Sequence, residues 1–135
     1  MRTETVEAIA DRLAAYDQIV EVGIGNRTAV ARELTARGVD VTATDIVDRE
    51  TPPEVEFVRD DVTAPTLSVY EAEVIFAQNL PPELHRPTAQ LARRVGADCL
   101  FTTLGGDPPL VEVSREQVPG ETLFVVADDP TEECD

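Results

Sequence analysis

Apolar residues recur along the chain at two different spacings. Val6, Ile9, Ala10 and Leu13 are three or four positions apart, which predicts a helix over residues 4–15 with one buried face. The next apolar segment, QIVEVGI, is short and rich in β-branched residues, as is typical of a buried strand. We therefore expect a helix and then a strand at the beginning of the chain.

A second helix is expected after the glycines of VGIG. Ala29, Val30 and Leu34 would form its inner face, Asn26 would cap its first turn and Gly38 would end it. The runs DVTATD, VEFVRDDV, AEVIFAQ and ADCLFTTL predict four further strands. Helix and strand therefore alternate through this part of the chain.

A third helix is expected between the last two of these strands. It follows the turn NLPP, and its inner face would carry Leu84, Thr88, Leu91 and Val95. Pro87 either bends this helix or lies in its first turn, where a proline costs no hydrogen bond.

Strands that alternate with helices predict right-handed crossovers and a mostly parallel, doubly wound sheet. The expected fold is an α/β three-layer sandwich with strand order 3-2-1-4-5, and the short interval after Asp61 leaves room for no more than a turn of helix. The segment VEVSREQVPGETLFVVAD contains two strand-like runs around VPGE, which predict an antiparallel hairpin at the sheet edge. We expect a single domain over residues 1–135, made of a helix (1–16), a core (17–104), the hairpin (105–127) and a tail (128–135).

The net charge of the chain indicates the medium in which the protein works. The chain has 27 acidic residues and 11 basic ones, all arginine, for a net charge of -16. The acids are spread along the whole chain, and 42% hydrophobic residues in regular patterns argue against a disordered acidic protein. Dispersed acidity is typical of a halophilic surface and does not fit the basic face that nucleic-acid binding requires.

The sequence contains none of the signals of a membrane, secreted or metal-binding protein. No apolar run approaches the roughly 18 residues that span a bilayer, and the N-terminus lacks an apolar signal core. Cys99 lies in an apolar run and is expected in the core, whereas Cys134 is expected at the surface. Neither has the spacing of a metal site or suggests a disulfide scaffold, so we expect a cytoplasmic protein without metal.

The first predicted strand ends in a glycine turn that contains Gly23 and Gly25. Glycine lets the backbone turn sharply and approach a ligand, and the helix N-terminus that follows favours negative charge. Asp45 ends the next strand about 20 residues later, where an acid can bind ribose hydroxyl groups. These features predict a nucleotide-type cofactor site; the alternative is a tight turn without a ligand.

Glu21 distinguishes between two classes of cofactor. In dinucleotide sites a pyrophosphate passes close to this turn, and a carboxylate would repel it. S-adenosylmethionine carries an ammonium and a sulfonium group instead, and a carboxylate attracts both. Glu21 therefore favours S-adenosylmethionine over NAD, unless it is one more paired acid in an acidic chain.

Residues 17–104 resemble the class I S-adenosylmethionine-dependent methyltransferases. VEVGIG matches their glycine motif and Asp45 their ribose acid, and AEVIFAQNLPP matches the fourth strand and the catalytic loop. The resemblance implies that Asp61, or Asp60 if the register shifts, meets the adenine amino group. More closely, VDVTATDI, the Pro-Pro-Glu-Leu run and VGAD are similar to a small archaeal family of uncharacterised proteins with a methyltransferase-like fold, of which this chain would be a haloarchaeal member.

Two departures from the methyltransferase pattern affect the expected function. Arg27 stands where a third glycine is common, and it could either fill the methionine pocket or bind the carboxylate of the cofactor. The Asn-Pro-Pro-aromatic motif of amino methyltransferases is replaced by NLPPE, which lacks the aromatic platform. His85 could be a general base, although a surface position is expected, and residues 105–107 either line the same crevice or form a hinge.

We therefore expect a binding site for S-adenosylmethionine or another nucleoside, with no assigned catalytic residue and no metal. Its predicted residues are Glu21, Gly23, Gly25, Arg27, Asp45 and Asp61. A minimal methyltransferase is an alternative, because alignment of the reactants alone supplies much of the rate. A structural or regulatory subunit that needs a partner protein is the third interpretation, and a homodimer is compatible with each of them.

Overall fold

The computed structural model describes residues 2–127, so the predicted tail and Cys134 lie outside the described part of the chain. The elements occur in the order α1 (Thr3–Leu13), β1 (Gln18–Val22), α2 (Ala29–Ala36), β2 (Asp40–Asp45), β3 (Glu56–Arg59), the short 3-10 helix η1 (Leu67–Tyr70), β4 (Val74–Ala77), α3 (Pro82–Val95), β5 (Asp98–Phe101), β6 (Val113–Val118) and β7 (Glu121–Val126). The alternation of helix and strand predicted from the apolar spacing is confirmed, with boundaries shifted by a few residues.

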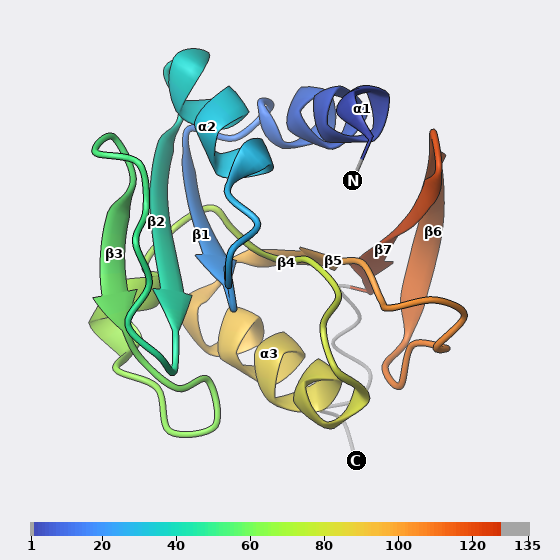
Figure 1. Cartoon of the computed structure of the whole chain (residues 1–135). Coiled ribbons are helices and arrows are strands. Elements are labelled where there is room, and N and C mark those ends of the chain that lie inside the picture. Colours follow the sequence, from blue (N-terminus) through green and yellow to red (C-terminus); the bar gives the residue numbers. More distant parts are fainter. Residues whose placement is uncertain (1, 128–135) are drawn as a thin grey trace.

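The strands form one sheet in the order β3-β2-β1-β4-β5-β7-β6. Strands β1 to β5 are parallel, whereas β7 pairs antiparallel with both β5 and β6. The predicted order 3-2-1-4-5 and the C-terminal hairpin at the sheet edge are therefore confirmed (Figure 1).

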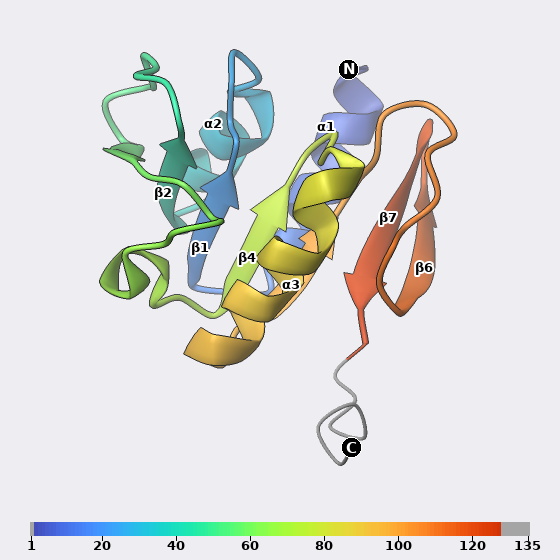
Figure 2. The same ribbon diagram turned by 90° about the horizontal axis from the view of Figure 1, so that it is seen from below.

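Helices cover both faces of this sheet, which confirms the three-layer sandwich. Helices α1 and α2 pack on one face, while α3 and η1 lie on the other (Figure 2). Each face has its own apolar core: Ile9, Leu13 and Leu34 belong to the first, and Tyr70 and Leu91 to the second. Burial on both faces explains why the central strands β1, β4 and β5 are largely apolar.

The beginning of α2 differs from the sequence prediction. Arg27 N donates to Ile24 O at 3.0 Å, so the chain makes an extra turn before the helix begins at Ala29. Thr28 is the N-terminal cap residue, but its side chain makes no capping hydrogen bond. The expectation that Asn26 caps the helix is wrong, because the extra turn moves the helix start beyond its reach. The expected end is close: Gly38 follows the cap Arg37 at φ +86°.

Helix α3 also begins earlier than Pro87 suggested. Pro81 precedes the helix and Pro82 is its first residue, so Pro87 lies inside it and the first-turn interpretation of this proline is wrong. The predicted inner face of this helix is confirmed at Thr88 and Leu91, which are both buried. Gly96 ends the helix at φ 76°, a left-handed conformation that glycine adopts without strain.

Candidate functional site

A cleft of about 460 Å³ lies at the carboxyl edge of the sheet. It is located where the strand order reverses between β1 and β4, which is the usual position of ligand sites in open α/β sheets. Four segments line it: the turn after β1, the end of β2, the segment after β3 and the loop after β4 into α3. Of the six predicted site residues, Gly23, Arg27, Asp45 and Asp61 line this cleft.

The glycine turn has the backbone conformation that the sequence suggested. Gly23 and Gly25 have φ values of +66° and +56°, in the region that side-chain-bearing residues rarely adopt. Gly23 N donates to Thr44 O at 2.8 Å, and Gly25 N donates to Asp45 Oδ2 at 2.9 Å. The turn after β1 is therefore fastened to the end of β2, next to the cleft.

Asp45 is held in one orientation by its neighbours. Besides the bond from Gly25, its Oδ1 accepts a hydrogen bond from Val47 N at 3.1 Å, and Arg49 Nε lies 3.4 Å from its Oδ2. Each carboxylate oxygen has two lone pairs, so Asp45 can still accept from a ligand. Ile46, the next residue, is 62% exposed and offers an apolar surface inside the cleft.

Glu21 lies behind the cleft rather than in its lining. It is 1% exposed in the middle of the sheet, and its Oε2 accepts a hydrogen bond from Gln78 Nε2 at 2.7 Å. Burial raises the pKa of Glu21 to about 8, against the opposing effects of the Gln78 hydrogen bond and the Arg27 charge. Near pH 7 this carboxyl group is mostly protonated, and its contact with a cofactor stays a prediction.

Arg27 folds back over the glycine turn. Its guanidinium group reaches within 3.7 Å of the position that a Gly25 β-carbon would occupy, and its charge acts on the buried Glu21. The side chain lines the cleft at the same time. Arg27 therefore lies at the cleft, as both of the roles expected from the sequence require.

The two acids after β3 differ in their free hydrogen-bonding capacity. Asp60 accepts hydrogen bonds from Thr66 N, Thr66 Oγ1 and the Tyr70 hydroxyl at 2.8–3.1 Å. Asp61 is exposed, and its Oδ1 accepts from Thr63 N at 2.8 Å and Thr63 Oγ1 at 2.7 Å. These bonds lower the pKa of Asp61, so it is ionised and open to a ligand donor.

The loop after β4 is fastened to the end of β5. Asn79 N donates to Thr102 Oγ1 at 2.9 Å, and Leu80 N donates to Thr102 O at 2.8 Å. Asn79 has a positive φ of 50°, which asparagine tolerates better than most residues. This loop is therefore a fixed wall of the cleft.

His85 supports this loop from the interior of the protein and is not at the surface. It is fully buried, its Nε2 lies 2.9 Å from Leu80 O, and its Nδ1 accepts from Leu110 N at 3.1 Å. Its ring packs on the Phe101 ring, with the two ring centroids 4.7 Å apart. The expected surface position is wrong, because both ring nitrogens bind backbone groups that are distant in the sequence or lie across a turn. Gly105, Gly106 and Asp107 are not among the cleft-lining residues.

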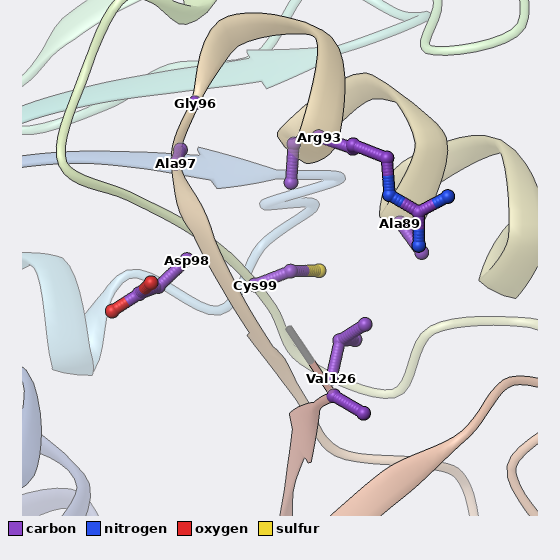
Figure 3. A pocket seen from close by; sticks show the side chains of 9 residues that line it. Ala89, Arg93, Gly96, Ala97, Asp98, Cys99 and Val126 are labelled. Atoms are coloured by element: carbon purple, nitrogen blue, oxygen red, sulfur yellow. The ribbon is translucent and has the colours of Figure 1, made fainter. Parts of the chain in front are cut away.

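A second hollow, of about 230 Å³, lies between α3 and strands β5 and β7. In Figure 3 the Cys99 thiol points into the space between α3 and Val126. Burial raises the pKa of this thiol to about 12. Within residues 2–127, no cluster of histidine, cysteine or acidic side chains has metal-binding geometry, and no helix is long and apolar enough to cross a membrane.

Known proteins share this sequence and this fold. A family model described as "Uncharacterised protein family (UPF0146)" matches residues 3–129. A UPF0146 protein of Halobacterium salinarum is 51% identical over 89% of this chain and 95% of its own length. One from Archaeoglobus fulgidus is 48% identical over 73% and 78%.

Two solved methyltransferases have a similar fold at low sequence identity. An RNA methyltransferase from Salinibacter ruber in complex with S-adenosyl-L-homocysteine superposes with a TM-score of 0.65 at 15% identity, over 96% of this chain and 94% of that one. A TehB-like SAM-dependent methyltransferase from Corynebacterium glutamicum gives a TM-score of 0.62 at 17% identity, over 92% and 86%. The predicted methyltransferase-like fold is thereby confirmed.

Proposed function

The chain belongs to the uncharacterised protein family UPF0146, and we propose that it binds S-adenosylmethionine or its demethylated product, S-adenosylhomocysteine, in the cleft at the carboxyl edge. The observation that carries this proposal is Asp45. Its carboxylate is oriented by Gly25 N at 2.9 Å, lines the cleft and keeps free lone pairs for ribose hydroxyl groups.

The surroundings of Asp45 fit an adenosine group. Ile46 is an exposed apolar side chain beside the ribose acid, where it can pack on a purine ring. Asp61 is ionised, and its Oδ2 can accept a hydrogen bond from an adenine amino group. This end of the cleft therefore suits the adenosine part of the ligand: Asp45 can bind the ribose, and Ile46 and Asp61 can bind the adenine base.

Binding rather than methyl transfer is proposed because the residues expected to act on an acceptor have other partners. His85 has both ring nitrogens engaged with backbone groups. The loop after β4 reads Asn79-Leu80-Pro81 and provides no aromatic side chain for an acceptor to stack on. The bound cofactor would supply an electrophilic methyl group, and this chain would hold and orient it.

Calorimetry in molar salt tests the proposal with S-adenosylmethionine, S-adenosylhomocysteine and NAD. Asp45→Ala should weaken binding of the first two by about 1–3 kcal/mol, because ribose hydroxyl groups lose their acceptor. Asp40→Ala is the matched control, since Asp40 begins the same strand at the opposite edge of the sheet. Binding of NAD alone, or no heat with any nucleoside, contradicts the proposal.

A further inference from the structure

The positive charge of the cleft is concentrated at its inner end. Among the described residues that line it, Arg27 is the only cation. Its guanidinium group lies over Gly25, within 3.7 Å of the β-carbon position of that glycine. The turn after β1 is therefore covered by a positive charge where a methyltransferase commonly has a bare glycine.

The buried acid behind this turn does not balance the charge of Arg27 at neutral pH. Glu21 interacts electrostatically with Arg27, and burial keeps Glu21 mostly protonated below about pH 8. Gln78, which donates to Glu21 at 2.7 Å, is neutral. Arg27, Glu21 and Gln78 together therefore carry a net positive charge near pH 7.

The other acids of the cleft are already engaged and belong to other segments. Asp45 has two backbone N–H donors and Arg49 beside it, and Asp60 has three donors. Asp61 binds Thr63 after β3, and Glu83 lies in the first turn of α3. Of these carboxylates, Asp45 reaches the turn that Arg27 covers, through Gly25 N, but its charge is paired with Arg49 at 3.4 Å.

We propose that Arg27 makes this cleft selective for the demethylated form, so that the chain binds S-adenosylhomocysteine in preference to S-adenosylmethionine. The inference rests on the proposed function and specifies which ligand it concerns. Both ligands carry a tail carboxylate, which an arginine can bind with two parallel hydrogen bonds. Only S-adenosylmethionine also carries a sulfonium charge, which the same guanidinium repels in a partly enclosed site.

The preference should depend on pH in one direction. As the pH rises from 6.5 to 8.5, Glu21 ionises and its negative charge offsets Arg27. The acids that line the cleft are Asp45, Asp60, Asp61 and Glu83, and hydrogen bonds from Thr63 lower the pKa of Asp61, away from this range. His85, the single histidine of the sequence, binds Leu80 and Leu110 rather than Glu21. The advantage of S-adenosylhomocysteine should therefore shrink as the pH rises.

The test measures the dissociation constants of both ligands by calorimetry, in molar salt at pH 6.5 and 8.5. At pH 6.5 the wild-type chain should bind S-adenosylhomocysteine at least tenfold more tightly. Arg27→Gln removes the charge and should reduce this ratio to about threefold or less. Arg32→Gln is the matched control, because Arg32 is an exposed arginine on α2 outside the cleft, and it should keep the wild-type ratio.

Glu21→Gln provides an independent readout. It mimics the protonated acid, so the ratio at pH 6.5 should be kept while its decline toward pH 8.5 disappears. Equal or tighter binding of S-adenosylmethionine by the wild type, or an unchanged ratio in Arg27→Gln, overturns this inference and leaves the proposed function standing. Binding of neither ligand overturns both. Circular dichroism of each variant shows that it is folded.

Discussion

The cleft at the carboxyl edge and the hollow beside α3 differ in what lines them. Side chains from four segments converge on the cleft, and hydrogen bonds orient Asp45, Asp60 and Asp61 within it. The hollow in Figure 3 is lined mainly by alanines, Gly96, a protonated thiol and Arg93. The proposed binding site therefore differs from the hollow in its oriented polar groups, which come from several segments.

The two regions also differ in charge. Asp45, Asp60, Asp61 and Glu83 line the cleft, whereas residues 84–97, which follow Glu83 in α3 and end just before β5, contain three arginines and no acid. The acid excess that suits a saline medium is thus unevenly distributed. Repulsion among carboxylates should be strongest around the cleft and weakest on α3.

Removing salt should have the largest effect and should separate the two regions. Without screening, the net charge of -16 repels itself, and the fold should loosen. Hydrogen exchange across a salt series should show faster exchange first in residues 60–66 beside the cleft, and later in residues 84–97. Circular dichroism that stays constant in dilute buffer contradicts the halophilic interpretation.

His85 joins the cleft loop to the buried core, so its loss should destabilise the fold. His85→Ala leaves Leu80 O and Leu110 N without partners and opens a cavity against Phe101. We expect the free energy of unfolding to fall by about 3–5 kcal/mol. Denaturant unfolding in molar salt measures this, and Arg86→Ala, the exposed neighbour, should change it by less than about 0.5 kcal/mol.

The sequence predicts the fold better than it predicts the site, for a physical reason. Apolar periodicity reports local burial, and it located every strand of the sheet. The glycine turn and Asp45 could also be predicted from the sequence, because tight turns and strand ends have characteristic local residue patterns. The burial of His85, the direction of Arg27 and the partner of Glu21 depend on contacts between distant segments, which no local pattern records.

Glu21 gives a smaller effect, with a sign that follows from its pKa. The folded chain holds this proton more tightly than the unfolded chain, because burial raises the pKa from 4.5 to about 8. The contribution of Glu21 to stability is therefore lost as the pH rises from about 4.5 to about 8. Glu21→Gln should remove this slope and raise the free energy of unfolding at pH 7.5 by about 1–3 kcal/mol, measured by denaturant titration at several pH values. Equal stability of variant and wild type at pH 7.5 contradicts the buried, protonated acid.

The smallest effect is expected at the hollow beside α3, where the Cys99 thiol should be unreactive toward alkylating reagents. At pH 8 a thiol with a pKa of about 12 is ionised in about one molecule in 10,000, roughly 10³-fold less than a free cysteine. In a Cys134→Ser variant, which leaves Cys99 as the single thiol, alkylation by iodoacetamide should proceed only as the chain unfolds. The measurement compares mass-spectrometric labelling in molar salt with and without denaturant. Rapid labelling of the folded variant would show that this hollow opens to solvent. The cleft and the hollow would then differ only in the charge of the residues around them.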